Sequence, residues 1–255
     1  MSEAVAAARP RVSVWADAAT LAQAAAGGLA AALREALAGR GAVSVALSGG
    51  RTPVPVYERL AAAPGIDWER VTLLLADERW VAPTDPASNE GMVRQRLLAG
   101  LPGPGPRFWP WAVRLDAEPA AVAATFAERL RSLEPSSDGG GPPVLDLLTL
   151  GMGPEGHTAS LFPGSPALAA TGWTAAPWVP EVGAPRLTLT PPVLRAARRT
   201  ILLAVGEDKA AALAAVVDGP VEWERWPAQV AVRGRPGCEV WCDRAAAAGL
   251  VEGRG

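Results

Sequence analysis

Residues 146–165 read DLLTLGMGPEGHTASLFPGS, and this stretch indicates the fold class more strongly than any other in the chain. It begins with a short apolar run that ends at a glycine, which is typical of a buried strand. A glycine-rich loop follows and carries His157, the only histidine of the protein, two positions after Glu155. A buried strand that leads into a polar loop is the local pattern of an α/β protein, whose ligands bind beyond the carboxyl ends of the strands.

The same alternation of apolar runs and helical stretches continues on both sides of this segment. Short runs rich in valine, leucine and isoleucine predict strands at Val12–Trp15, Ala42–Leu47, Val71–Ala76, Leu145–Leu150, Arg186–Leu189, Thr200–Val205 and Cys238–Trp241. Longer periodic stretches predict helices from about Ala18 to Ala38, from about Pro53, and over Asn89–Leu98, Ala120–Leu133 and Lys209–Val217. Ser88 to Glu90 has the pattern of a helix N-cap, and Asp243 is placed to cap a last short helix.

This order of elements predicts an α/β fold: a three-layer αβα arrangement with a mainly parallel, Rossmann-like sheet. No linker is long enough to divide the chain, because the soft stretch EPSSDGGGPP at 134–143 has the character of a surface loop. We therefore expect residues 1–255 to form a single domain, without internal repeats.

The composition excludes several classes of function. The formal net charge is −2 and there is no lysine-rich run, so we expect no nucleic-acid partner. The alanine-rich stretch at 18–33 contains polar and glycine residues and ends in charged ones, which favours a helix packed on a sheet over a membrane span. The N-terminus lacks the pattern of a secretory signal, so we expect a cytoplasmic protein.

The two cysteines, Cys238 and Cys242, lie four positions apart. Their spacing is neither a CxxC motif nor half of a zinc site, since only one histidine is available to complete one. We expect both to be small core residues on one face of a strand. No metal and no cofactor is expected.

Four polar segments follow predicted strands: SGGRTP at 48–53, DER at 77–79, GMGPEGH at 151–157 and GEDK at 206–209. Because the carboxyl ends of parallel strands meet at one edge of a sheet, we expect these segments to gather there. The SGGRTP loop precedes a helix start, where backbone amides can hold an anion, although a tight strand-to-helix turn explains it equally well. The DER segment taken alone is more often a solvated turn.

His157 and Lys209 stand out because the chain uses arginine almost everywhere else. Lys209 is the only lysine among 24 basic residues. An imidazole can accept a proton from water near neutral pH, and a neighbouring carboxylate such as Glu155 can orient it. Lys209 and Arg186 are candidates for holding a phosphate. The alternatives are a structural histidine, a surface arginine on a strand, and a coding bias that spared one lysine.

Together these segments resemble the 6-phosphogluconolactonases, which are relatives of the glucosamine-6-phosphate deaminases. The resemblance runs from SGGRTP through DERWV and the later SN, GMGPEGHTASLFPGS, RLTLT and GEDKAAAL to WCDRAA, and so covers nearly the whole chain. It implies hydrolysis of 6-phospho-D-glucono-1,5-lactone to 6-phosphogluconate, a step of the oxidative pentose phosphate pathway, without a metal. The expected partner is thus a small phosphosugar lactone, and we expect a monomer or a weak homo-oligomer.

The resemblance also implies roles for individual residues. His157 matches the catalytic base, and Asp77 and Arg79 match the pair that lines the sugar. Contacts to the sugar and its phosphate are implied for Ser48, Gly49, Gly50, Thr52, Arg186 and Lys209. Glu155 stands where the family often has aspartate, and either Glu155 or Asp77 is a candidate for orienting His157. Arg51 occupies a position that we take as variable.

Two other functions remain open. A sugar-phosphate deaminase or isomerase would carry GH-x-A-F-N-E, with a glutamate five positions after the histidine. Phe162 stands at that position here, which disfavours proton transfer on an opened sugar. A non-catalytic sugar-phosphate sensor would use the same binding residues, but it would not need His157 and Asp77.

Overall fold

The computed structural model describes residues 9–135 and 141–251. Its centre is a parallel sheet of seven strands in the order β1-β11-β10-β6-β2-β3-β5. These strands are β1 (Arg11–Trp15), β2 (Val43–Leu47), β3 (Val71–Leu75), β5 (Arg107–Trp109), β6 (Leu147–Gly151), β10 (Arg199–Ala204) and β11 (Cys238–Asp243). The predicted mainly parallel sheet is confirmed.

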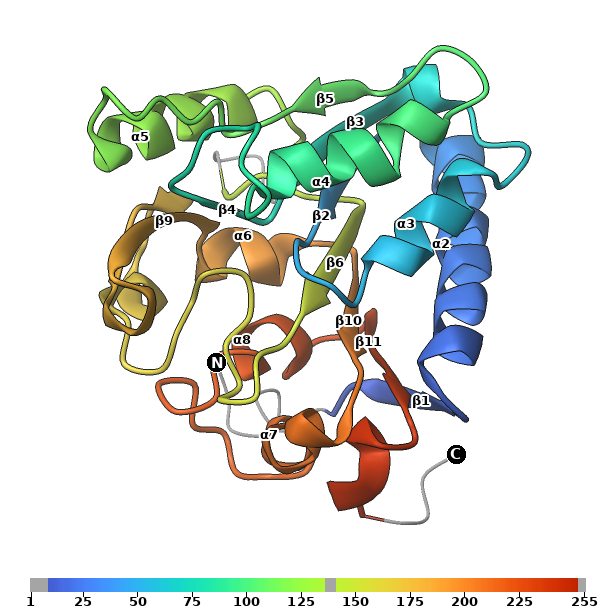
Figure 1. The fold of residues 1–255 in the computed structure, drawn as a ribbon, viewed down its shortest axis with the longest axis vertical. Coiled ribbons are helices and arrows are strands. Elements are labelled where there is room, and N and C mark those ends of the chain that lie inside the picture. The colour runs from blue at the N-terminus through green and yellow to red at the C-terminus, as the bar shows by residue number, and fades with distance from the viewer. Residues whose placement is uncertain (1–8, 136–140, 252–255) are drawn as a thin grey trace.

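Helices cover both faces of this sheet. Figure 1 shows α2 and α3 on one side and α6 and α8 on the other, which gives the three predicted layers. The helices are α2 (Ala18–Arg40), α3 (Val54–Ala61), α4 (Asn89–Arg96), α5 (Pro119–Leu130), α6 (Pro191–Ala196), α7 (Ala210–Val217) and α8 (Gln229–Val232). Short 3-10 turns lie at η1 (Trp68–Arg70), η2 (Leu98–Gly100), η3 (Pro166–Ala169), η4 (Pro180–Val182), η5 (Glu207–Lys209) and η6 (Ala246–Gly249).

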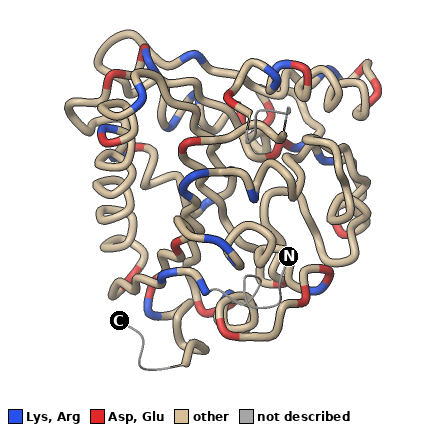
Figure 2. Tube along the Cα trace, turned by 180° about the vertical axis from the view of Figure 1, so that it is seen from behind, with Lys and Arg blue, Asp and Glu red and all other residues tan. Residues whose placement is uncertain are grey.

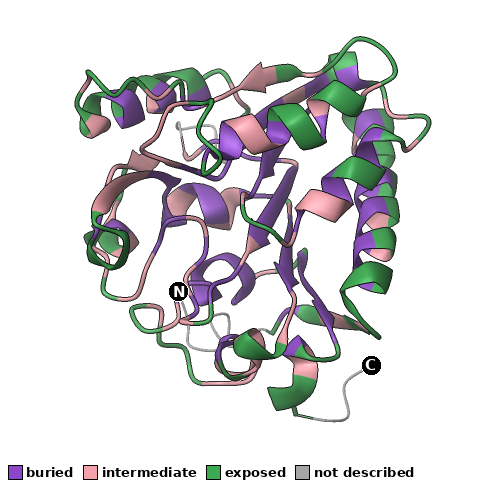
Figure 3. Ribbon diagram, in the orientation of Figure 1, coloured by how far each residue is buried: buried purple, intermediate pink, exposed green. Residues whose placement is uncertain are grey.

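The alanine-rich stretch forms the long helix α2, as predicted. Asp17 caps its first turn, because its carboxylate accepts a hydrogen bond of 2.8 Å from the backbone N–H of Thr20. One face of the helix buries alanine and leucine against the sheet, while the other face is exposed (Figure 3). Small alanine side chains let a helix lie close to the strands, so this composition suits a packed helix. Within the described residues, no helix is long and apolar enough to cross a membrane.

The strand predicted at Arg186–Leu189 is present as β9 (Ala184–Leu189), but it lies outside the parallel sheet. It forms a small antiparallel sheet with β4 (Asp77–Arg79), β7 (Thr174–Ala175) and β8 (Trp178–Val179). The interpretation of DER as a solvated turn is therefore wrong, since Asp77–Arg79 form β4. Only short turns, including the 3-10 turn η4, separate β7, β8 and β9, and connections this short permit only antiparallel pairing.

The predictions for the two cysteines and for the Asp243 cap are confirmed. Cys238 and Cys242 are buried and unbonded to each other, and burial raises the pKa of the Cys242 thiol to about 12. The carboxylate of Asp243 accepts a hydrogen bond of 2.8 Å from Ala246 N and so caps the last short helix. The loop predicted over 134–143 is described only at its ends, because residues 136–140 lie outside the described part, as do the first eight residues.

Candidate active site

A cavity of about 650 Å³ lies where strands β2, β3, β6 and β10 reach their carboxyl ends. All four polar segments contribute to its lining, as the parallel sheet predicts. The small antiparallel sheet adds Arg186 from β9, opposite Arg79 of β4. Every residue singled out from the sequence lines this cavity: Ser48, Gly49, Gly50, Thr52, Asp77, Arg79, Glu155, His157, Arg186 and Lys209.

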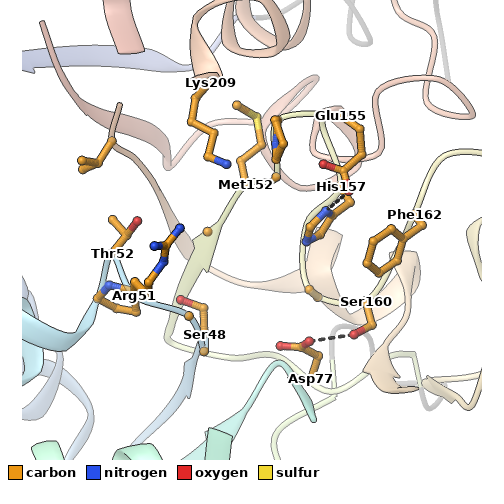
Figure 4. Close-up of a pocket in the computed structure, with 18 of the residues that line it drawn as sticks. Ser48, Arg51, Thr52, Asp77, Met152, Glu155, His157, Ser160, Phe162 and Lys209 are labelled. Atoms are coloured by element: carbon orange, nitrogen blue, oxygen red, sulfur yellow. Dashed lines mark hydrogen bonds and ion pairs between the residues drawn. The ribbon is translucent and has the colours of Figure 1, made fainter. Parts of the chain in front are cut away.

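His157 is held by its neighbour Glu155. Its Nδ1 lies 2.7 Å from Glu155 Oε1, and the other ring nitrogen faces the open side of the pocket (Figure 4). An ionised carboxylate can only accept a hydrogen bond, so Nδ1 is the donor, and in the neutral imidazole Nε2 is then the nitrogen with the free lone pair. The hydrogen bond from His157 is the main reason that the pKa of Glu155 lies below its usual range. The arrangement is that of an oriented general base.

The loop that carries this pair turns tightly and depends on glycine. A Cβ atom built on Gly153 would collide with Nδ1 of His157 and with the carboxylate of Glu155. Gly153 N also donates a hydrogen bond of 3.0 Å to His157 O, which closes the turn. Gly153 is thus required by the close approach of the loop to its own side chains, whereas Gly156 is required by its positive φ of 83° and its contact with Trp226.

Phe162 stacks on the imidazole of His157. The ring centroids are 4.2 Å apart and the planes differ by 20°, and both side chains line the pocket. The sequence identified Phe162 only as a residue that replaces a glutamate. Its contact with His157 could not be read from spacing alone.

Asp77 is held by two residues that sequence reasoning did not assign to the site. Ser160 Oγ donates a hydrogen bond of 2.7 Å to one carboxylate oxygen, and Asn89 Nδ2 lies 3.3 Å from the other. Within the described chain, Asp77 makes no hydrogen bond to His157. The residue that orients the histidine is therefore Glu155. Asp77 lines the cavity separately from this pair.

Glu78, between Asp77 and Arg79, has a structural role. It is only 1% exposed, and its carboxylate accepts three hydrogen bonds of 2.7 Å from the backbone N–H groups of Arg79, Asn89 and Glu90. Ser88 caps the same helix start through Gly91 N, as predicted. Burial is the main reason that the pKa of Glu78 is raised. This carboxylate fixes β4 to the start of α4.

The loop at 48–53 approaches that same region closely. A Cβ atom on Gly49 would collide with the side-chain amide of Asn89, so only glycine fits there. The hydroxyl of Ser48 is buried in the cavity wall and has no hydrogen-bond partner among the described residues. Tyr57 Oη donates a hydrogen bond of 2.9 Å to Ser48 O from behind and stiffens the loop.

Cationic side chains line another side of the cavity. Figure 4 shows Arg51 and Lys209 with their charged ends turned toward the same space. Arg186 is half-buried beside Arg79 across the β4–β9 pair, and burial together with the Arg79 charge lowers its pKa. In the part of the chain that is described, Arg51 and Arg186 form no ion pair, whereas Lys209 Nζ lies 3.0 Å from Asp208.

This gathering of positive charge is local. Elsewhere along the trace, basic and acidic positions are interspersed (Figure 2). An excess of cations at one side of a cavity favours an anionic ligand group. Across residues 9–135 and 141–251, no cluster of three or more histidine, cysteine or acidic residues is arranged to hold a metal ion. Arg51, which the sequence left as variable, is thus a site residue that was missed.

Comparison with known proteins agrees with the geometry. The family model described as glucosamine-6-phosphate isomerases/6-phosphogluconolactonase matches residues 16–241. The chain is 40% identical over 220 residues to the 6-phosphogluconolactonase of Pseudomonas aeruginosa, covering 84% of this chain and 87% of that protein.

Solved structures share the fold. The 6-phosphogluconolactonase of Trypanosoma brucei superposes with a TM-score of 0.82 at 27% identity, covering 96% of this chain and 100% of that one. A monomeric glucosamine-6-phosphate deaminase reaches a TM-score of 0.74 at 22% identity, with 94% and 99% coverage, and this likeness concerns the fold alone. From the family match and these relatives, the chain belongs to the glucosamine-6-phosphate isomerase/6-phosphogluconolactonase family.

Proposed function

We propose that this protein is a hydrolase that converts 6-phospho-D-glucono-1,5-lactone to 6-phospho-D-gluconate, acting in the cytoplasm as a single domain of residues 1–255. The observation that carries the proposal is the Glu155–His157 pair, which presents Nε2 to a cavity whose other side is cationic. A phosphosugar lactone has a reactive carbonyl at one end and a dianion at the other. The relatives named 6-phosphogluconolactonase support the same assignment.

In the proposed reaction, His157 acts first as a base. Its Nε2 takes a proton from water while the water oxygen bonds to the lactone carbonyl carbon. Glu155 stabilises the imidazolium that forms, because its carboxylate accepts the Nδ1 proton. General-base catalysis of this kind contributes about 10²–10⁴-fold to a rate.

His157 then acts as an acid. The tetrahedral oxyanion collapses, the bond from the carbonyl carbon to the ring oxygen breaks, and the imidazolium returns its proton to that oxygen. The product carboxylic acid ionises and releases one proton to solvent. Arg79, which lines the cavity, is the candidate to stabilise the oxyanion, with Asp77 placed to hold a sugar hydroxyl.

The opposite side of the cavity holds the phosphate in this proposal. Arg186 offers a planar guanidinium that can donate two hydrogen bonds to the phosphate, and Lys209 offers a compact positive charge. The 48–53 loop offers its backbone amides and the nearby hydroxyl of Thr52. These contacts orient the lactone and favour phosphorylated substrates, and they take no part in bond breaking. Ser48 Oγ, buried without a hydrogen-bond partner in the described part of the chain, is placed to donate to the ligand.

Deaminase or isomerase activity is the rival within the same fold. Ring opening needs an acidic group beside the histidine, and the corresponding position holds Phe162, which lies against the imidazole. No carboxylate other than Glu155 hydrogen-bonds His157 among the described residues. The stacking of Phe162 on His157, in place of an acidic group, favours lactone hydrolysis over sugar-phosphate deamination or isomerisation.

Purified protein tests the proposal directly. The lactone should be formed in situ and its hydrolysis followed by acid release, with the uncatalysed rate subtracted. Glucosamine 6-phosphate should be assayed in parallel for ammonia release, and 6-phosphogluconate binding should be measured by calorimetry. Accelerated hydrolysis without ammonia release is expected; ammonia release would favour the deaminase, and binding without any turnover would favour a sensor.

A further inference from the structure

The aromatic ring of Phe162 lies almost parallel to the imidazole of His157. The centroid separation of 4.2 Å and the interplanar angle of 20° describe a stacked pair. Figure 4 shows Phe162 beside the imidazole, on the side away from Arg51 and Lys209. The mechanism described above gives this ring no part.

The hydrogen bond that His157 donates to Glu155 leaves one rotation of the imidazole unrestricted. It fixes the tautomer and the position of Nδ1, but the imidazole can still tilt about the line that joins Nδ1 to the carboxylate. Such a tilt would swing Nε2 away from the attacking water. A flat ring packed on one imidazole face removes that rotation, because any tilt costs stacking contact or causes a clash.

The backbone holds Phe162 in this place. Leu161 N donates to Thr158 O at 2.9 Å, so the chain turns back directly after His157 and brings Phe162 over its ring. Gly164 N then donates to Glu224 O at 2.9 Å and Ala228 N donates to Gly156 O at 2.9 Å. The segment 224–228 thus fastens both ends of the turn, and Phe162 is not a loosely placed side chain.

We propose that Phe162 is a positioning residue for the lactonase reaction, which sets the plane of the His157 imidazole so that Nε2 points at the water. The inference rests on the function proposed above.

Three variants separate positioning from folding. Phe162→Leu keeps an apolar side chain but removes the flat ring, while Phe162→Tyr keeps the ring. Phe126→Leu is the matched control, because Phe126 stacks on Trp111 with a centroid distance of 4.1 Å and an angle of 21°, outside the cavity lining. The control loses an equivalent aromatic contact without touching His157.

The single histidine makes the geometry directly measurable. In the proton NMR spectrum, the ring protons of His157 should be shifted upfield by the face of Phe162. Phe162→Leu should remove this shift, whereas Phe162→Tyr and Phe126→Leu should retain it. An unchanged His157 resonance in Phe162→Leu would overturn the stacking on which the proposal depends.

Kinetics test the consequence. Phe162→Leu should lower kcat by about tenfold, because small misplacement of a reacting group is costly, while KM changes by less than about twofold. Phe162→Tyr should restore kcat to near the wild-type value, and Phe126→Leu should leave it unchanged. If wild type is active and Phe162→Leu keeps full kcat, the positioning role is wrong and the proposed function stands. A wild-type protein without lactonase activity overturns both.

Discussion

The two sides of the cavity are built in different ways. Glu155, His157 and Phe162 come from one short segment, and each already contacts another through a hydrogen bond or a stacked face. Arg51, Arg186 and Lys209 come from three distant segments and form no bond with one another among the described residues. The reacting side is organised before any ligand binds, whereas the cationic side is held together only by the fold and awaits an opposite charge. Mutations on the reacting side should therefore lower kcat, and mutations on the cationic side should raise KM.

The largest effect is expected from His157→Ala. The enzyme-dependent hydrolysis rate should fall by about 10²-fold or more, since no other described residue presents a free imidazole nitrogen to the cavity. Affinity for 6-phosphogluconate and the thermal unfolding midpoint should stay near wild type. Retention of most of the activity, after subtraction of the uncatalysed rate, would remove His157 from the role of base.

Loss of a cation on the opposite side should appear in KM. Lys209→Ala and Arg186→Ala should each raise KM for the phosphorylated lactone by about tenfold to hundredfold, the usual value of one charge-assisted hydrogen bond. Unphosphorylated gluconolactone should be affected little. Arg114→Ala, which removes an exposed cation outside the cavity lining, serves as the charge-matched control. If KM rose equally for the phosphorylated and the unphosphorylated lactone, these residues would not bind the phosphate. The proposed difference between the reacting side and the cationic side would then be wrong.

The Glu155→Gln variant tests whether the Glu155 carboxylate orients His157 on the reacting side. It should lower kcat by about tenfold and raise KM less, because the carboxylate acts mainly on the imidazolium that forms during the reaction. Glu155→Asp, which keeps the charge, should retain most of the activity. Wild-type behaviour of the glutamine variant across pH 6–9 would show that the 2.7 Å contact does not orient the base.

The smallest effect concerns acid stability. The hydrogen bond from His157 lowers the pKa of Glu155 in the folded protein, so the pair stabilises the fold above the unfolded-state pKa of about 4.3. This stabilisation is lost as the pH falls through the lower folded-state pKa. The difference in Tm between wild type and Glu155→Gln should therefore be small at neutral pH and should shrink below about pH 4. A difference that grows in acid would contradict the direction of the shift.

Much of the site was predictable because it follows from one topological rule. Apolar runs with polar residues at their ends were enough to identify Ser48, Asp77, His157 and Lys209 as neighbours at one edge of a parallel sheet. The Glu155–His157 contact was also within reach, since two residues of one glycine-rich turn must lie close together.

Contacts between distant segments were not predictable in the same way. Ser160 and Asp77 are 83 positions apart, and nothing in either local pattern indicates that their side chains meet. Phe162 was recognised only as a replaced glutamate, because whether it stacks on His157 depends on how the chain turns at Thr158–Leu161. Arg51 was left aside because its role depends on where its guanidinium points.

By itself, the sequence determined the longer strands, the helices α2, α3, α4, α5 and α7, and the capping residues Ser88 and Asp243, because hydrophobic periodicity and capping act over a few residues. It did not indicate β5, α6 or α8. Only the tertiary structure decided that β4 and β9 leave the parallel sheet and carry Asp77, Arg79 and Arg186 to the cavity as a separate antiparallel unit. It also decided that Glu78 faces inward to hold the start of α4 while its two neighbours face the cavity. The physical reason is that pairing partners and side-chain directions depend on packing among segments that no local pattern connects.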